Sequence, residues 1–413
     1  MKVVLGPDRD GHRAVFQDGR LVWEGSTIPP HTLTDGGFPS NDRAERITWL
    51  PCPEHRITHG FVNAHTHLYS GLFAYGVARP TPWPSELRAI LERLWWRLDR
   101  ALDAELLTIA ARVVIAESLL SGTTTLIDHH ESPSFIAGSL AILTDELERL
   151  GARGVVCYGA TERNGGLREA HEGLDECERT IRRLRRSRVS TRIAGMVGLH
   201  AGFTVSDETL REAAALADLL DVGLHIHAAE GALDVEDARR RGYRGVVHRL
   251  DANLALGRKT ILAHGVHCDP EEVALARSRG AWFVQNPRSN LNNGVGYPRH
   301  LVHARQVALG TDGFPAVMRD EVFCALEQGL PLGEPVGEPE RRLAHGLELA
   351  SLHLSPEVRE DRVAMGPAGA FHAVVAGRVV VREGRLVDLD HEGLREEARR
   401  LAGVLDLRMR QME

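Results

Sequence analysis

The sequence contains two pairs of histidines, His65/His67 and His225/His227, in which one residue separates the two members. On a β-strand, residues i and i+2 point to the same face, so each pair can present two imidazoles to one point. Such an arrangement suits a divalent metal ion. With 21 histidines in 413 residues, about one such spacing is expected by chance, so the pairs need partners elsewhere in the chain.

Polar side chains suited to bind a metal ion, a proton or a substrate also follow the later apolar runs of the chain. In chain order they are Asp128, His129, His130, Arg163, His200, His227, Glu230, His264, Asn286 and Asp312. One histidine taken alone is more often a hydrogen-bonded core residue or a surface residue. A whole series, with each member at the end of an apolar run, indicates one site that they share.

The apolar runs themselves predict the strands that position these residues. They lie at 57–64, 124–127, 155–158, 193–199, 223–227, 260–263, 282–284 and 307–309. Helical patterns separate most of them, with apolar spacings of three and four at 87–98 and a second helix from its N-cap Asp103 to Leu120. The alternation predicts an α/β fold, a parallel (β/α)8 TIM-like barrel with its active site at the carboxyl ends of the strands.

Short apolar runs separated by glycine-rich turns occupy both ends of the chain, at 3–6, 14–17, 21–24, 47–50 and 371–381. We expect these ends to form one small composite β-sandwich beside the barrel. The expected division assigns residues 1–56 to the N-terminal part of the sandwich and 57–365 to the catalytic barrel. Residues 366–413 then form the C-terminal part of the sandwich and a terminal helix.

Composition narrows the class of protein. A net charge of −7 argues against nucleic acid or an anionic membrane as partner. No signal peptide or membrane-spanning apolar stretch is visible. The five cysteines are scattered and in no Cys-x-x-Cys spacing, which is typical of reduced thiols. Together these features predict a cytoplasmic protein.

Four local motifs resemble the amidohydrolase superfamily. They are Gly-Phe-Val-Asn-Ala-His-Thr-His at 60–67, His-Ala-Ala-Glu at 227–230, Leu-Ala-His-Gly at 262–265 and Gly-Thr-Asp-Gly at 310–313. The chain looks like the mononuclear branch that holds guanine, cytosine, S-adenosylhomocysteine and s-triazine deaminases. Within that branch, the segments 94–102, 127–130 and 286–290 are most similar to the SsnA-like aminohydrolases.

The resemblance implies a set of roles for the residues found above. One divalent ion, Zn²⁺ or Fe²⁺, would be bound by His65, His67, His227 and Asp312. Imidazoles and a carboxylate suit either ion. The catalytic residues would be Glu230, which moves a proton from water to substrate, His264, which hydrogen-bonds the water or the developing oxyanion, and Asp312, which also accepts a proton. The expected substrate contacts are His200, Arg163 and His129.

The lysine content favours one ion over two. Binuclear members of the superfamily generally bridge two ions through a carboxylated lysine at the end of the fourth strand. Lys2 and Lys259 are the only lysines of this chain, and neither lies there.

The expected function is therefore that of a metal-dependent hydrolase that deaminates a purine-, pyrimidine- or triazine-like heterocycle. Metal-bound hydroxide would attack the ring and ammonia would leave. One alternative is hydrolysis of a cyclic amide or a formimino C–N bond at the same site, and a second is a metal-binding barrel without catalysis. The expected partners are a small-molecule substrate and a second copy of the chain in a homodimer, with no nucleic acid and no membrane.

Overall fold

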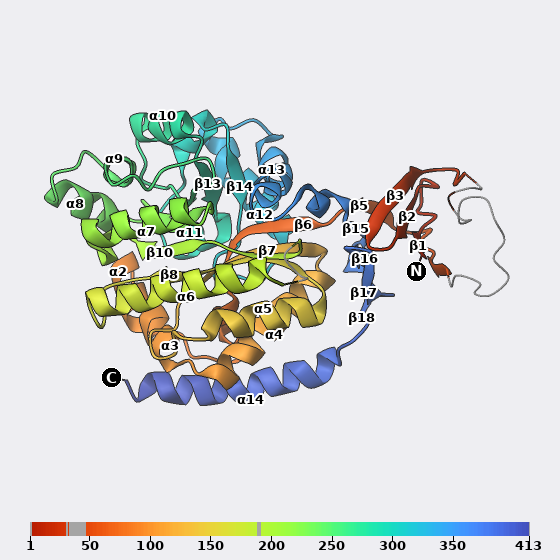
Figure 1. The fold of residues 1–413 in the computed structure, drawn as a ribbon, viewed down its shortest axis with the longest axis horizontal. Coiled ribbons are helices and arrows are strands. Elements are labelled where there is room, and N and C mark those ends of the chain that lie inside the picture. Colours follow the sequence, from red (N-terminus) through yellow and green to blue (C-terminus); the bar gives the residue numbers. More distant parts are fainter. Residues whose placement is uncertain (1, 30–31, 33–46, 188–190, 413) are drawn as a thin grey trace.

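Eight parallel strands form a barrel in the middle of the chain. The computed structural model describes residues 2–29, 32, 47–187 and 191–412. The barrel strands are β6 (Phe61–Thr66), β7 (Thr123–His130), β8 (Arg153–Ala160), β10 (Val197–Ala201), β11 (Leu224–Ala228), β12 (Ile261–His264), β13 (Trp282–Gln285) and β14 (Val307–Leu309). Neighbours in this order pair with one another, and a bridge between Thr66 and Asp312 brings the first and last strands together. The predicted (β/α)8 barrel is confirmed (Figure 1).

α-Helices follow the strands and cover the outside of the barrel (Figure 1). They are α4 (Ala104–Leu120), α5 (Ser139–Leu150), α6 (Leu167–Arg185), α7 (Asp207–Leu219), α8 (Ala232–Arg240), α9 (Val246–Ala252), α10 (Pro270–Arg279), α12 (Met318–Gly329) and α13 (Glu338–His353). The short α11 (Pro287–Asn292) lies instead at the carboxyl ends of the strands, where its Ser289 and Asn290 side chains contact Asp312 and His264. Short 3-10 turns lie at 68–70, 73–75, 202–204, 299–303, 330–332 and 356–360. The helix expected after Asp103 begins there, because the Asp103 carboxylate accepts a hydrogen bond from the Leu106 amide at 2.9 Å.

The helix expected at 87–98 is interrupted. α2 (Leu87–Ile90) and α3 (Trp96–Ala101) are separated by a π-helical turn at Leu91–Trp95. A π-turn widens the helix locally, and such turns are frequent at functional sites. Trp95 and Trp96, at the end of this turn, both line the cavity described below.

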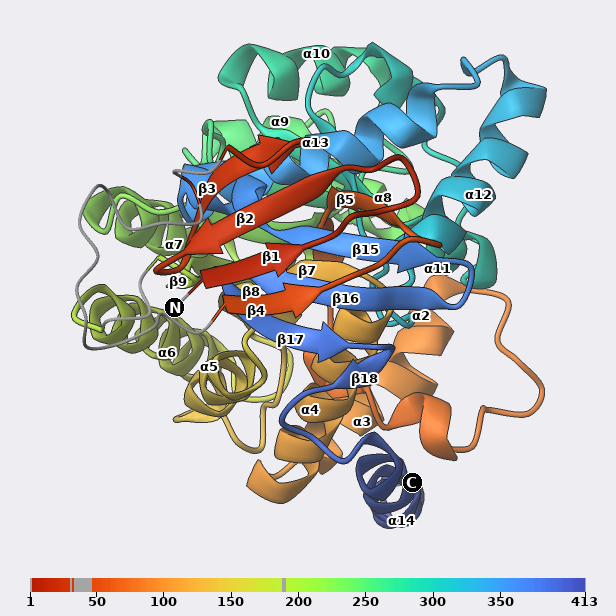
Figure 2. The same ribbon diagram turned by 90° about the vertical axis from the view of Figure 1, so that its right-hand side faces the viewer.

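The two ends of the chain build a β-sandwich beside the barrel. One sheet has the order β3 (Arg20–Gly25), β2 (Arg13–Gln17), β1 (Lys2–Leu5), β4 (Ile47–Leu50). The other has the order β18 (Arg385–Leu386), β17 (Arg378–Arg382), β16 (Gly369–Val375), β15 (Arg362–Gly366), β5 (Arg56–His59). Figure 2 shows the two sheets one in front of the other. One apolar core between them includes Val3, Phe16, Leu50 and Val374. The predicted composite sandwich is confirmed.

Two predicted strands are each two strands in the structure. The run at 57–64 contains β5, which pairs with β15 in the sandwich, and β6, which enters the barrel. Gly60 lies between them, where an added Cβ would clash with the Thr124 side chain. The run at 193–199 likewise contains β9 (Ile193–Gly195), which pairs with β8, and the start of β10. The expected domain division at 56/57 and 365/366 stays a prediction.

The last helix, α14 (His391–Arg410), packs along α3 and α4 (Figure 1). Arg408 ties it to the end of α3, with its Nη1 atom 3.2 Å from the Ala101 carbonyl oxygen and 2.7 Å from the Asp103 carboxylate. In the part of the chain that the structure describes, no helix has the length and apolar character to cross a membrane.

Candidate metal centre and active site

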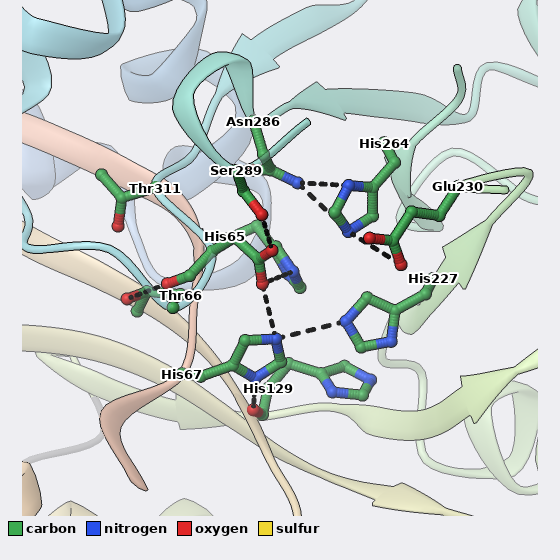
Figure 3. Close-up of polar contacts among 12 residues, drawn as sticks. His65, Thr66, His67, His129, His227, Glu230, His264, Asn286, Ser289 and Thr311 are labelled. Carbon is green, nitrogen blue, oxygen red and sulfur yellow. Dashed lines mark hydrogen bonds and ion pairs between the residues drawn. The ribbon is translucent and has the colours of Figure 1, made fainter. Parts of the chain in front are cut away.

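Four predicted metal ligands meet at the carboxyl ends of the barrel strands. His65 lies in β6, His67 directly follows it, His227 lies near the end of β11 and Asp312 follows β14. The Nε2 atom of His67 lies 3.3 Å from Nε2 of His227 and 2.9 Å from Oδ1 of Asp312. Nε2 of His65 lies 3.6 Å from the same carboxylate oxygen. Figure 3 shows the three imidazoles gathered at one point.

Main-chain carbonyl groups fix two of these imidazoles from behind. Nδ1 of His67 lies 2.5 Å from the carbonyl oxygen of His129, and Nδ1 of His227 lies 2.7 Å from that of His200. A carbonyl oxygen can only accept, so Nδ1 carries the hydrogen in each ring. The lone pair of each Nε2 atom is therefore turned toward the cluster, as metal ligation requires.

His65 tests whether the cluster suits a metal ion. Its Nδ1 lies 2.9 Å from Nε2 of His225, whereas its own Nε2 is buried without a hydrogen-bond partner. Ligand atoms bound at 2.0–2.1 Å to a tetrahedral ion lie about 3.3 Å from one another. The three distances between predicted ligand atoms, 3.3, 2.9 and 3.6 Å, are close to this value. Three imidazoles and one carboxylate thus fit a divalent ion such as zinc or iron.

His264, which is predicted to hydrogen-bond the attacking water, lies close enough to the cluster to be a ligand itself. Its ligand atom and those of three predicted ligands, His65, His227 and Asp312, all lie within 4.8 Å of one another. Nδ1 of His264 lies 2.9 Å from Oδ1 of Asn290. If Nδ1–H donates to that oxygen, neutral His264 presents the lone pair of Nε2 to the cluster. His264 can therefore accept a hydrogen bond from a water there or add a ligand.

Glu230 lies beside the ligands rather than among them. Ala229, with φ 51°, turns the chain after β11, so that Glu230 faces the cavity next to His227. Oε2 of Glu230 lies 3.8 Å from Nε2 of His264, and Oε1 accepts a hydrogen bond from Asn293 at 3.3 Å. Burial raises the pKa of the Glu230 carboxyl. A carboxyl with a raised pKa is suited to proton transfer near neutral pH.

Asp312 is held in a strained backbone conformation. Its φ is 54° and that of His264 is 76°, in a region that residues other than glycine rarely adopt. The Asp312 amide donates to the His65 carbonyl oxygen at 3.0 Å, and the Ser289 hydroxyl donates to its Oδ2 atom. Burial alone would raise the pKa of Asp312, but the His65 and His67 imidazoles hold it well below its usual range. The carboxylate is therefore ionised and fixed in direction.

A cavity borders on the cluster. Its apolar and aromatic walls come from Tyr69, Leu91, Trp95, Trp96, Ala201, Phe203 and Gly313. Its polar walls come from His67, Asp99, Glu131, His200, His227, Glu230, His264, Asn293 and Asp312. Aromatic walls with a few converging polar groups are typical of a site for a small planar molecule.

The three predicted substrate contacts lie in different places. His200 lines the cavity. Arg163 forms an ion pair with Asp99 at 2.6 Å and stands over the Trp96 ring, so it supports the wall from behind. His129 is fully buried with Nε2 3.0 Å from the Leu199 carbonyl oxygen, and it packs against His67 and His227. The structure therefore does not bring His129 into the cavity.

Trp96, Asp99 and Glu131 are among the cavity residues that sequence reasoning missed. Glu131 comes two positions after His129, where strand alternation places both side chains on one face, and this spacing is a signal that the sequence did contain. Trp96 and Asp99 lie in the interrupted helix, whose periodicity indicated packing alone. The π-turn that brings them to the cavity leaves no comparable pattern in the sequence.

Comparison with known proteins agrees with this geometry. Residues 56–338 match the amidohydrolase family, and the chain belongs to this family. It is 31% identical over 397 residues to the 8-oxoguanine deaminase of Pseudomonas aeruginosa, covering 91% of this chain and 80% of that protein. It is 26% identical over 438 residues to the 5-methylthioadenosine/S-adenosylhomocysteine deaminase of Desulforudis audaxviator, covering 97% and 96%.

The fold has a close counterpart among solved structures. An adenosine deaminase from Xanthomonas campestris with bound zinc superposes with a TM-score of 0.78 at 20% identity, over 98% of both chains. The resemblance inferred from the motifs is thus confirmed, as is the predicted class of hydrolase acting on C–N bonds other than peptide bonds.

Proposed function

We propose that this protein deaminates an amino-substituted nitrogen heterocycle and releases ammonia. The observation that carries the proposal is the position of Glu230, whose buried carboxyl borders the cavity beside His264 and the ligand cluster. A proton carrier at that point is what hydrolytic removal of an amino group requires. The similarity to deaminases named for 8-oxoguanine and for methylthioadenosine supports the same class of reaction.

We further propose that the ion is zinc, held by His65, His67, His227 and Asp312. The zinc in the related adenosine deaminase structure supports this choice over iron. When bound, such an ion lowers the pKa of a water molecule from 15.7 toward about 7 and so supplies hydroxide at neutral pH.

The residues of the chain account for the proton transfers. Glu230 accepts one proton from the attacking water and delivers it to the ring nitrogen next to the reacting carbon. His264, fixed through Nδ1 by Asn290, accepts a hydrogen bond at Nε2 and orients the water. Asp312 accepts the second proton and passes it to the amino group, which leaves as ammonia. The ring keeps the oxygen as a carbonyl.

Ammonia release from a panel of heterocycles tests the proposal. Zinc-loaded protein would be incubated with aminopurines and their nucleosides, aminopyrimidines and amino-s-triazines. We expect at least one compound to release ammonia with wild-type protein. Glu230→Gln, prepared in parallel, is the control: ammonia release at the wild-type rate with this variant would indicate a contaminating deaminase. If no compound of the panel releases ammonia and a cyclic amide or a formimino compound is hydrolysed, the result would support the alternative reaction instead.

A further inference from the structure

The cavity wall contains polar atoms that neither hold the ion nor move the proton. They belong to Trp96, Asp99 and Glu131, and the two acids are 2% and 3% exposed. Nε1 of Trp96 and Oδ1 of Asp99 are buried and have no hydrogen-bond partner among the described residues. Buried polar atoms in proteins are nearly always paired. These two atoms are therefore available to a molecule that enters the cavity.

Arg163 fixes the donor and the acceptor in place. Its Nη2 atom donates to Oδ2 of Asp99 at 2.6 Å, and its guanidinium lies 5.0 Å from the centre of the Trp96 ring. One oxygen of Asp99 is thereby neutralised while the other remains free to accept. The Trp96 indole, packed against the guanidinium, offers its single N–H.

Glu131 adds a second carboxylate to this wall. Oε2 of Glu131 lies 3.9 Å from Nδ1 of His67, but that nitrogen already donates to the His129 carbonyl oxygen. Glu131 is therefore not needed to orient a metal ligand. Gly159 on β8 leaves room for it, because a Cβ there would clash with the Glu131 carboxylate. Oε1 of Glu131 lies 2.7 Å from Nδ1 of the buried His129. The other oxygen, Oε2, can accept a hydrogen bond from a bound molecule.

We infer that Trp96, Asp99 and Glu131 bind the edge of a heterocyclic base in which a ring carbonyl lies between two N–H groups. The carbonyl oxygen accepts from the indole N–H, and the two N–H groups donate to the carboxylates. An 8-oxopurine base carries this cyclic-urea edge on the ring that lacks the amino group. In a nucleoside the sugar replaces one of these hydrogens. The inference rests on the proposed deamination and narrows it, because it makes the substrate an oxidised free base rather than a nucleoside.

Three substrates test the edge directly: 8-oxoguanine, guanine and 8-oxoguanosine. We expect kcat/KM for 8-oxoguanine to exceed each of the other two by about 10²-fold or more, because a site built to bind a polar group rejects analogues that lack it. Trp96→Phe keeps a ring and removes the N–H. It should lower kcat/KM for 8-oxoguanine by about 10-fold and affect guanine much less. Trp49→Phe, on the exposed face of β4, is the matched control and should change neither.

Equal losses on both substrates would mean that Trp96 has only a structural role, and the inference would be wrong. Preference for 8-oxoguanosine or another nucleoside over the free base would also overturn it.

Binding of two purines that have no amino group to lose separates this inference from the proposed function. 8-Oxohypoxanthine carries the cyclic-urea edge on its five-membered ring, whereas hypoxanthine has no ring carbonyl between two N–H groups. Calorimetric titration of zinc-loaded protein should give a Kd for 8-oxohypoxanthine about 10-fold or more below that for hypoxanthine, and Trp96→Phe should remove the difference. Equal Kd values with ammonia release from the panel would refute the inference and leave the proposed function intact. Tighter binding of 8-oxohypoxanthine without ammonia release from any compound would uphold the recognised edge and refute the deamination.

Discussion

His67 and His227 face each other through Nε2 atoms 3.3 Å apart, while main-chain carbonyl groups hold the Nδ1 atom of each ring. The two carbonyls belong to His129 on β7 and His200 on β10. The barrel backbone thus sets the direction of both imidazoles, which are predicted metal ligands. Metal binding should therefore be tight and cause little change in structure.

Removing one ligand tests the assignment of the metal centre. His227→Ala should lose most of the bound ion, because only three of the four predicted ligands remain. Wild-type protein should contain about one divalent ion per chain by elemental analysis, since the cluster supplies one tetrahedral set. His171→Ala, on the exposed face of α6, is the control and should keep the ion. Two tightly bound ions, both needed for activity, would contradict the mononuclear site.

Glu230→Gln separates proton transfer from metal binding. The substitution keeps the size of the side chain and removes its proton-carrying carboxyl, so kcat should fall by about 10²–10⁴-fold. The metal content and the thermal unfolding midpoint should stay at wild-type values. Loss of the ion together with activity would show that Glu230 is itself a ligand, and unchanged kcat would remove it from the mechanism.

Arg163→Ala is expected to act on stability as well as on the substrate. Its ion pair with Asp99 is buried, since the side chains of Arg163 and Asp99 are 7% and 2% exposed. Removing one partner of a buried pair leaves an uncompensated charge, and the free energy of unfolding should fall by about 3–5 kcal/mol. Denaturant titration measures this change. Adding Asp99→Asn should recover much of the loss, and a fully stable single variant would show that the pair is not formed.

The pH dependence of stability should reveal the bridge that joins the two sheets of the sandwich. Arg362 on β15 donates to both carboxylate oxygens of Glu24 on β3, at 2.7 and 2.6 Å, and lowers the pKa of Glu24 to about 2. A glutamate in the unfolded chain has a pKa of about 4.3. The bridge therefore stabilises the protein above that value, and its contribution is lost as the pH falls toward about 2. Acid titration of the free energy of unfolding should be steeper for wild type than for Glu24→Gln.

The barrel could be predicted because its strands are buried on both faces and so appear as continuous apolar runs. The same property concealed the break at Gly60, since β5 and β6 share one apolar run although they belong to different sheets. Only the pairing partners of each strand, which lie far away in the sequence, separate the two.

The convergence of the four expected ligands could be predicted because each lies at or near the end of a strand in a recognisable motif, and their role as ligands stays a prediction. His129 also follows that pattern, but its side chain packs under His67 and His227 instead of entering the cavity. Asp99 could not be identified, because its role depends on a π-turn and on an ion pair with a residue from another loop. The cytoplasmic location, the homodimer and the absence of a nucleic-acid partner stay predictions.

The pairing of β6 with the residue after β14 has a consequence for biosynthesis. Thr66 and Asp312 are 246 residues apart in the chain. At about 5–20 residues per second, a ribosome takes on the order of ten seconds or more to make the intervening segment. Throughout that time His65 and His67 exist without the carboxylate that completes their site, and β5 exists without β15. The nascent chain therefore competes poorly for metal, and loading of the ion belongs to the period after the last barrel strand has left the ribosome.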